Sequence, residues 1–279
     1  MNETKVDLRA RAQRVRGHVL RLAARGGCFV GASLSSTDLM VHLYSRVLRV
    51  TPETMADPAR DVFLLSKGHD APALYGTLVE CGFLPEARLA RHLSPSDSLY
   101  WHPNTAVPGV EFHSGSLGHL LSVGIGIALD ARLRQSGSRV FVMLGDGELN
   151  EGSVWEACLV AAAHRLDNLV AIVDRNGFQA NARTEDLIPL EPLGAKFEAF
   201  GWTCAGVDGH DFEALDAAFA SLPARPGRPT AVVARTRRGR GVPRLENRAE
   251  GWFLRLTPEE AETMVAELDE AMTAEAARR

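Results

Sequence analysis

The feature that most constrains this chain is a pair of short, largely apolar segments, each followed by small polar residues. The first runs from Arg139 to Leu144 and leads into Gly145-Asp146-Gly147; the second runs from Leu169 to Asp174 and leads into Asn176-Gly177. Short, apolar runs of this kind are typical of buried parallel strands. A helix is predicted between them, from about Asn150 to Leu166. The order strand, helix, strand predicts two parallel neighbours in one sheet.

The ends of these two strands predict a metal site. Since the carboxyl ends of parallel strands meet at one edge of a sheet, Asp146 and Asn176 are expected to lie side by side there. Carboxylate and amide oxygens suit Mg²⁺ or Ca²⁺. The flanking glycines allow the backbone to approach a ligand, and the free N–H groups of the following helix attract phosphate. The sequence therefore predicts a divalent cation that holds diphosphate oxygens.

Strand and helix patterns alternate along the rest of the chain, with no linker and no internal repeat. This alternation predicts a doubly wound, mostly parallel α/β sheet flanked by helices, and a single domain over residues 1–279. A long irregular segment, 93–118, is expected to be functional. Asp70 is expected to cap a helix that has Pro72 in its first turn. The predicted strands are 63–65, 139–144, 169–174, 202–207 and 230–235, and the other predicted helices are 2–25, 35–48, 120–133, 193–200, 212–222 and 258–276.

The composition excludes several classes of protein. The chain is 46% hydrophobic and 24% charged with a net charge of −4, which is ordinary for a globular enzyme and argues against a nucleic-acid surface. No apolar run approaches the ~18 residues that span a bilayer, so no membrane contact is expected. The charged N-terminus lacks the apolar centre of a signal peptide. Four scattered cysteines without a C-x-x-C pattern predict reduced thiols in the cytoplasm.

Seven motifs carry a family resemblance. They are LSKGH (65–69), WHP (101–103), PGVE (108–111), GSLG (115–118), LGDGELNEG (144–152), DRNG (174–177) and VDGHD (207–211). With these motifs, from about Arg16 to Thr257, the chain resembles the diphosphate-binding half of transketolase, and most of all the N-terminal subunit of the split, two-polypeptide form. The GDG motif with Asn176 placed 30 positions after Asp146 is typical of thiamine diphosphate enzymes.

The resemblance implies a role for each matching residue. Asp146, Asn176 and the main-chain carbonyl of Phe178 would hold Mg²⁺ or Ca²⁺, which bridges the diphosphate of the cofactor. His69 and Gly147 would contact the diphosphate. The remaining cofactor-binding positions would be Gly115 and Leu117 near the aminopyrimidine, Gly145 in the turn, and Glu151 near a contact between subunits. His69 and His102 would be the catalytic histidines, with His102 facing the reacting carbon.

The resemblance also implies the reaction and the assembly. A transketolase moves a two-carbon ketol unit from a ketose, commonly a ketose phosphate, to an aldehyde or aldose acceptor. In the family, a glutamate of the pyrimidine-binding domain activates the cofactor, and no such domain follows before Arg279. That domain is therefore expected on a partner chain, the C-terminal transketolase subunit. Two such pairs would form an α₂β₂ enzyme that acts on small molecules.

Two departures from the family keep other readings open. Phe29 stands where a family histidine reaches the donor, and, by a looser alignment, Trp252 replaces a second one. Fewer hydrogen-bond donors would favour either a modified sugar or a less hydroxylated donor, such as the 2-oxo acid pyruvate; the latter would make the enzyme a decarboxylating carboligase. A non-catalytic scaffolding subunit is a further alternative. A dinucleotide-binding dehydrogenase is disfavoured, because Gly124-x-Gly126 lacks the third glycine of that motif and lies in a predicted helix.

Overall fold

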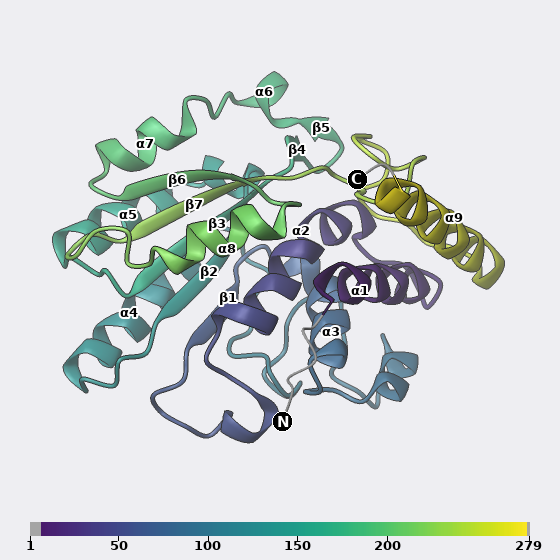
Figure 1. Cartoon of the computed structure of the whole chain (residues 1–279), viewed down its shortest axis with the longest axis horizontal. Coiled ribbons are helices and arrows are strands. Elements are labelled where there is room, and N and C mark those ends of the chain that lie inside the picture. The colour runs from purple at the N-terminus through teal and green to yellow at the C-terminus, as the bar shows by residue number, and fades with distance from the viewer. Residues whose placement is uncertain (1–6, 278–279) are drawn as a thin grey trace.

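The computed structural model describes residues 7–277, and a five-stranded sheet lies at its centre (Figure 1). The strand order is β1-β2-β3-β7-β6, and every neighbouring pair is parallel. The strands are β1 (Val62–Leu65), β2 (Val140–Gly145), β3 (Leu169–Arg175), β6 (Thr203–Asp208) and β7 (Thr230–Arg235). All five strand predictions are confirmed to within one or two residues, and so is the parallel arrangement.

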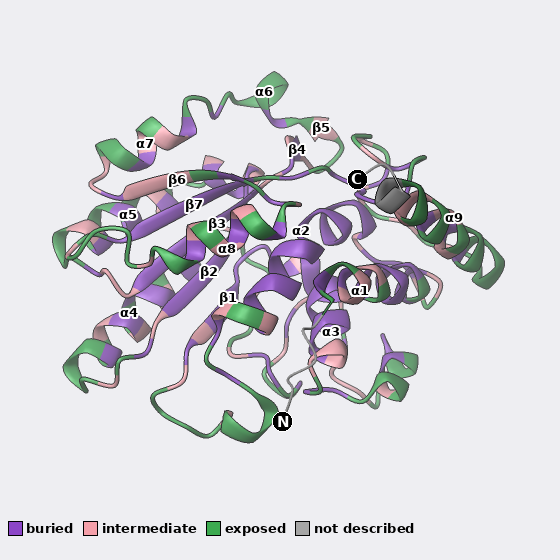
Figure 2. Ribbon diagram, in the orientation of Figure 1, coloured by how far each residue is buried: buried purple, intermediate pink, exposed green. Residues whose placement is uncertain are grey.

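Helices cover both faces of the sheet, because alternate side chains of each strand point to opposite sides. Phe141 and Met143 pack toward one layer of helices, whereas Val140, Val142 and Leu144 pack toward the other. The central strands β2, β3 and β7 are therefore buried, whereas the edge strand β6 and the outer faces of the helices are partly exposed (Figure 2). The first layer is α1 (Leu8–Ala23), α2 (Val30–His42), α3 (Ala71–Glu80), α8 (Phe212–Ala220) and α9 (Pro258–Ala277); the second is α4 (Leu120–Leu133), α5 (Gly152–Ala163) and α7 (Leu193–Ala199).

The predicted start of the second helix, at residue 35, was wrong, because α2 already begins at Val30. The hydroxyl oxygens of Ser35 and Ser36 lie 2.8 and 3.2 Å from the carbonyl oxygen of Ala32, one turn earlier, so these serines lie inside the helix and do not cap it. The predicted cap by Asp70 was also wrong: its carboxylate makes no capping bond to α3. For the first helix, the part of the prediction that covers residues 2–6 lies outside the described residues.

Two features near the sheet edge were not predicted. After the GDG turn the chain first forms a 3₁₀ turn, η5 (Gly147–Asn150), so α5 starts at Gly152. After β3 a short antiparallel hairpin follows, formed by β4 (Phe178–Gln179) and β5 (Ala182–Arg183), and then the one-turn helix α6 (Thr184–Leu187). These short pieces carry no clear periodicity in the sequence, because they are too short to repeat a pattern.

The irregular segment 93–118 contains no helix or strand, as predicted. It is nevertheless fixed to the helices of the first layer. The indole Nε1 of Trp101 donates to the carbonyl of Gly27 over 2.9 Å, and the hydroxyl of Tyr75 on α3 donates to the carbonyl of His102 over 3.0 Å. These bonds hold the WHP motif beside the start of α2.

The described part of the chain bears on two predictions, that the cysteines are unpaired and that no segment is long and apolar enough to span a membrane. Cys28, Cys81, Cys158 and Cys204 are all free thiols. Between residues 7 and 277, no helix combines the length and the apolar character that crossing a membrane requires.

Candidate functional site

The polar residues that follow β2 and β3 meet at the carboxyl edge of the sheet. Gly145, the last residue of β2, is paired in register with Asp174 of β3. Asp146 therefore lies next to the turn that follows β3, and its Oδ2 accepts a 2.6 Å hydrogen bond from the N–H of Gly177. The Oδ1 of Asn176 accepts a 3.0 Å hydrogen bond from the N–H of Phe178. The predicted proximity of the two strand ends is confirmed.

A cavity of about 250 Å³ opens at this edge and collects most of the predicted site. Two of the ten predicted residues, His102 and Gly115, do not line it. The residues that were predicted and line it are His69, Leu117, Gly145, Asp146, Gly147, Glu151, Asn176 and Phe178. The cavity is also lined by Ala32, Lys67, Glu148, Gln179, Ala180, Arg238 and Trp252. Segments from seven parts of the chain thus converge on one pocket.

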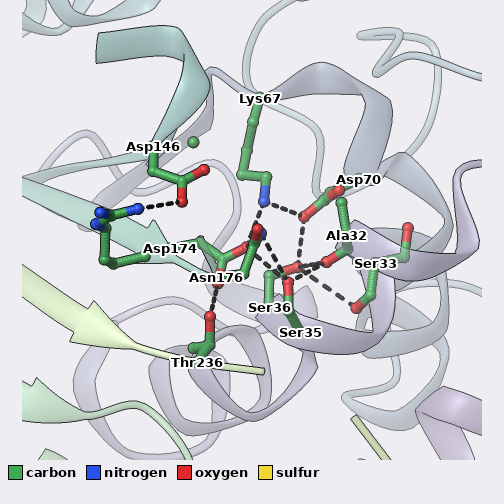
Figure 3. Close-up of polar contacts among 12 residues, drawn as sticks. Ala32, Ser33, Ser35, Ser36, Lys67, Asp70, Asp146, Asp174, Asn176 and Thr236 are labelled. Atoms are coloured by element: carbon green, nitrogen blue, oxygen red, sulfur yellow. Dashed lines mark hydrogen bonds and ion pairs between the residues drawn. The ribbon is translucent and has the colours of Figure 1, made fainter. Parts of the chain in front are cut away.

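Asp146 is almost completely buried, with 1% of its surface exposed. Its Oδ2 also accepts a 3.0 Å hydrogen bond from Nη1 of Arg175 (Figure 3). Its Oδ1 accepts a 2.9 Å hydrogen bond from the N–H of Gly147. Burial, together with the nearby carboxylate of Asp174, raises the pKa of Asp146. Burial and the negative charge of Asp174 both disfavour the ionised form of Asp146. A bound cation would offset both effects, so this carboxylate is suited to bind one.

The two predicted catalytic histidines lie on either side of Phe29. The ring centre of Phe29 is 5.6 Å from that of His69 and 6.1 Å from that of His102. Burial lowers the pKa of both histidines; with the added charge of Lys67, the pKa of His69 falls to about 3. His69 is therefore a neutral imidazole near pH 7, able to donate one hydrogen bond and to accept another.

His102 and Gly115 lie just outside the cavity and touch each other. Gly115 has a φ of +141°, and a Cβ at this position would lie 3.0 Å from Cδ2 of the His102 ring. Glycine is thus required here both by the backbone conformation and by the histidine.

Gly147 has a different reason to be glycine from the predicted one. A Cβ on Gly147 would lie 2.7 Å from Cγ of Gln179, in the hairpin that follows β3. Packing between η5 and the hairpin therefore requires glycine at this position, whether or not a ligand approaches the backbone.

Phe29 also contacts two aromatic rings from the segment that precedes α9. Its ring centre is 5.1 Å from that of Trp252 and 5.1 Å from that of Phe253. We call Phe29, His69, His102, Trp252 and Phe253 the aromatic cluster. It forms a largely apolar wall beside the cavity, broken only by the two imidazoles and the indole N–H.

Glu148 is a site residue that the sequence analysis missed. It is 2% exposed, and its carboxylate accepts from the N–H of Gly145 over 3.0 Å, from the N–H of Gly118 over 2.8 Å, and from the hydroxyl of Ser66. It therefore joins the ends of β1 and β2 to the GSLG motif. Burial raises the pKa of this carboxyl. Its neighbour Glu151 is exposed and precedes α5 without a capping bond.

Two buried cations line the cavity, Arg238 and Lys67. Arg238 is 2% exposed, donates through Nη1 to the carbonyl of Ala180, and lies over the ring of Phe178 at 5.2 Å. Its Nε and Nη2 have no hydrogen-bond partner among the described residues. Burial lowers its pKa to about 10, so it remains charged near neutral pH. An unpaired guanidinium at a cavity is suited to an anionic ligand.

The oxygen atoms of Asp146, Asn176 and Phe178 suit a divalent cation that takes its remaining ligands from a bound molecule. Residues 7–277 contain no group of three or more His, Cys, Asp or Glu side chains that could enclose a metal ion. Mg²⁺ or Ca²⁺ would receive only three protein ligands here, one carboxylate, one amide oxygen and one main-chain carbonyl, which do not fill its coordination shell. A ligand with phosphate oxygens would have to complete the shell, as is common for Mg²⁺. The free donors of Arg238 offer a second anchor for the same phosphates.

Comparison with known proteins places this site in a family. Residues 19–268 match the family model described as transketolase, thiamine diphosphate binding domain. The chain is 38% identical over 247 residues to one subunit of an apulose-4-phosphate transketolase from Actinobacillus succinogenes, covering 88% of this chain and 89% of that protein. It is 34% identical over 271 residues to a 6-deoxy-6-sulfo-D-fructose transketolase subunit of a Clostridium species, covering 96% of this chain and 98% of that protein.

Solved structures show the same fold. The transketolase of Leishmania mexicana superposes with a TM-score of 0.82 at 23% identity, over 98% of this chain. The match covers 45% of that longer chain. This chain is therefore similar in length to the subunits and about half as long as this transketolase.

Proposed function

The chain belongs to the transketolase family as a thiamine diphosphate-binding domain, and we propose that it is the cofactor-binding subunit of a heteromeric transketolase. The reaction would move a two-carbon ketol unit from a ketose or ketose phosphate to an aldehyde or aldose acceptor. The observation that supports this most directly is the cavity at the ends of β2 and β3, where eight of the predicted residues meet.

Asp146, Asn176 and the main-chain carbonyl of Phe178 would hold Mg²⁺ or Ca²⁺, and the metal would hold the diphosphate. Gly145 and Gly147 would bring the backbone of the turn against that diphosphate. The neutral imidazole of His69 would donate a hydrogen bond to it, and Arg238 would add a positive charge. These groups would neutralise most of the diphosphate charge inside a buried cavity, where an unpaired anion would be costly.

When bound, thiamine diphosphate would supply a nucleophilic carbon for the carbonyl of the donor and a group that can take up negative charge. The chain's own residues would place the reactants. Gly115 and Leu117 would lie near the aminopyrimidine, and Glu151 near the contact between subunits. His102 would face the reacting carbon, and His69 would lie beside it; both are neutral and able to exchange a proton with a donor hydroxyl.

A partner chain would complete the site. The matching relatives are named as subunits, and this chain spans nearly their whole length. We propose that the pyrimidine-binding domain and its glutamate reside on a C-terminal transketolase subunit, in an α₂β₂ assembly in which this chain contributes one domain. The four free thiols are consistent with the cytoplasm as its compartment.

The aromatic cluster favours a second candidate function. Phe29 and Phe253 offer no hydrogen-bond donor, so the wall beside the histidines suits a donor with few hydroxyl groups. A 2-oxo acid such as pyruvate meets that description, and the enzyme would then be a decarboxylating carboligase. Release of CO₂ from pyruvate would distinguish this candidate from ketol transfer, which releases none.

The deciding measurement is a calorimetric titration of thiamine diphosphate with Mg²⁺ into the full chain, alone and mixed with its pyrimidine-binding partner. Tight, metal-dependent binding that requires the mixture supports the shared site, and turnover should likewise require both subunits. Absence of binding in both samples would contradict the catalytic proposal and leave a scaffolding role.

In the same titration, Asp146→Ala should weaken metal-dependent cofactor binding by roughly 100-fold or more, because the variant removes the only carboxylate ligand of the proposed set. Asp186→Ala, at an exposed position on α6, is the matched control and should bind as the native chain does. An unchanged affinity in Asp146→Ala would remove the metal assignment.

A further inference from the structure

Asp174 lies directly beneath the proposed metal site and is completely buried. Its Oδ2 accepts hydrogen bonds from Nδ2 of Asn176 at 2.9 Å and from Oγ of Ser35 at 2.7 Å. Its Oδ1 accepts from the hydroxyl of Thr236. These partners come from α2, from the end of β3 and from the residue after β7, so Asp174 lies at the centre of a network that crosses three segments (Figure 3).

Lys67 supplies the counter-charge for this carboxylate. The ammonium group is 1% exposed and is paired with both Asp174 and Asp70, the latter at 3.0 Å. The buried ion pair with Lys67 balances the negative charge of Asp174, which has no access to solvent.

The charge of Asp174 determines how the amide of Asn176 is oriented. A carboxylate only accepts hydrogen bonds, so the NH₂ of Asn176 must face Asp174. The opposite orientation would set the amide oxygen against the carboxylate and the NH₂ against the N–H of Phe178. In the observed orientation Oδ1 receives that N–H and keeps a second lone pair for another partner.

We propose that Asp174 is a positioning residue, which holds Asn176 with its amide oxygen directed to the divalent cation. Asp174 is then not a ligand itself, and Ser35 and Lys67 contribute by holding its carboxylate in place. Hydrogen-bond partners behind a metal ligand fix its orientation and raise its donor strength, and their loss typically weakens metal affinity by about 10- to 100-fold. The inference rests on the proposed function, because it assumes that Asn176 is a metal ligand.

The test is a titration of Mn²⁺, followed by electron paramagnetic resonance, into the assembled pair of subunits with saturating thiamine diphosphate. Asp174→Asn should raise the Mn²⁺ dissociation constant by at least about tenfold, since a neutral amide at 174 no longer dictates the orientation of its neighbour. The spectrum of bound Mn²⁺ should broaden as well, because the ligand is no longer held in one geometry.

Asp61→Asn is the matched control. Asp61 is equally buried and is also paired with two basic side chains, Arg49 and Arg139, but it lies at the opposite edge of the sheet, just before β1. It should destabilise the chain without changing Mn²⁺ affinity. Equal weakening in Asp61→Asn and Asp174→Asn would show a general loss of stability and overturn the inference.

A second variant guards against misfolding. Ser35→Ala removes one hydrogen bond to Asp174 and leaves the charges of Lys67, Asp70 and Asp174 in place, so it should fold and still weaken Mn²⁺ binding, by less than Asp174→Asn does. Native-like affinity in both variants overturns the role of Asp174 while leaving the metal site intact. If the native assembly itself binds no Mn²⁺, the metal site fails, and the inference fails with it.

Discussion

Under the proposed function, Phe29 is the residue whose side chain would most directly limit the choice of donor. It occupies the middle of the aromatic cluster, within 5.1 to 6.1 Å of four other ring centres. Any part of a donor that extends past His69 and His102 meets this ring. A hydroxyl group placed there would lose its bonds to water without gaining one from the protein, which costs about 1–3 kcal/mol.

Phe29→His should therefore improve the use of ordinary ketose phosphates. One recovered hydrogen bond contributes about 0.5–1.5 kcal/mol, which corresponds to a gain in kcat/KM of roughly two- to tenfold. The measurement compares kcat/KM for a ketose phosphate and for pyruvate in the assembled enzyme. Phe29→Leu, which removes the ring without adding a donor, should show no gain for the sugar. Equal gains in both variants would mean that bulk, and not hydrogen bonding, sets the preference.

At the residue scale the sequence predicted those site residues that lie in motifs or directly follow strands. Asp146 and Asn176 follow from strand ends alone. Glu148 and Lys67 stand inside recognised motifs, but nothing local shows that Glu148 joins three segments or that Lys67 reaches Asp174, which is 107 positions away. Such partners are fixed by tertiary packing, which a local pattern does not contain.

Helix α4 contains two glycines, Gly124 and Gly126, whose surroundings differ. A Cβ on Gly124 would lie 2.8 Å from Cγ2 of Val142 on β2, whereas a Cβ on Gly126 would meet nothing within 4 Å. Val142 is fully buried and β-branched, so it has little freedom to move. Gly124 thus sets how closely α4 packs on the sheet, and Gly126 only costs helix stability.

Gly124→Ala should accordingly lower the free energy of unfolding by about 1–3 kcal/mol through overpacking. Gly126→Ala should raise it by about 0.5–1 kcal/mol, because alanine favours the helix and solvent surrounds the added methyl group. Urea denaturation of the full chain measures both. A destabilised Gly126→Ala variant, or a neutral Gly124→Ala variant, would contradict the packing of this helix.

At the element scale, strands and long helices were predictable, and short connections were not. The bounds of α4 agree with the prediction at both ends. The start of α2 was missed because Ser35 and Ser36 resemble capping residues, while their hydroxyls in fact bond to the preceding turn. The hairpin of β4 and β5 has two residues in each strand, too few to produce a recognisable alternation.

For the whole molecule, the stability of the fold at low pH depends on Asp61, whose ion pairs join the starts of two strands to a neighbouring segment. Its carboxylate accepts from the backbone N–H and the guanidinium of both Arg49 and Arg139, and so fastens the starts of β1 and β2 to the segment that follows α2. Burial raises the pKa of Asp61, but the two arginines outweigh burial and lower it from 3.8 to about 2.

A folded-state pKa below the unfolded one gives stability that is complete above pH 3.8 and lost as the pH falls toward about 2. Because Arg49 is half exposed and solvent weakens its pairing, we expect a contribution on the order of 1–2 kcal/mol. Asp61→Asn should lose that amount at pH 7, and the difference from the native chain should shrink between pH 4 and pH 2. A difference independent of pH would contradict the ionic origin.

The parallel sheet with helices on both faces was predictable at this scale because strand and helix patterns alternate along the whole chain. The gathering of seven parts of the sequence into one cavity was not, apart from the positions that the family resemblance supplied. Loop conformation depends on contacts such as those of Trp101 with Gly27, which join residues far apart in the chain.

Three rings of the aromatic cluster and the proposed metal ligands belong to different parts of the architecture, and this separation bears on how such enzymes diversify. Asp146 and Asn176 are attached to the strand ends of a rigid sheet, whereas Phe29 precedes α2 and Trp252 and Phe253 lie in the segment before α9. Mutation can therefore alter the wall without disturbing the sheet edge. Over evolutionary time a lineage can acquire new substrates by drift in two peripheral segments while inheriting its cofactor chemistry unchanged.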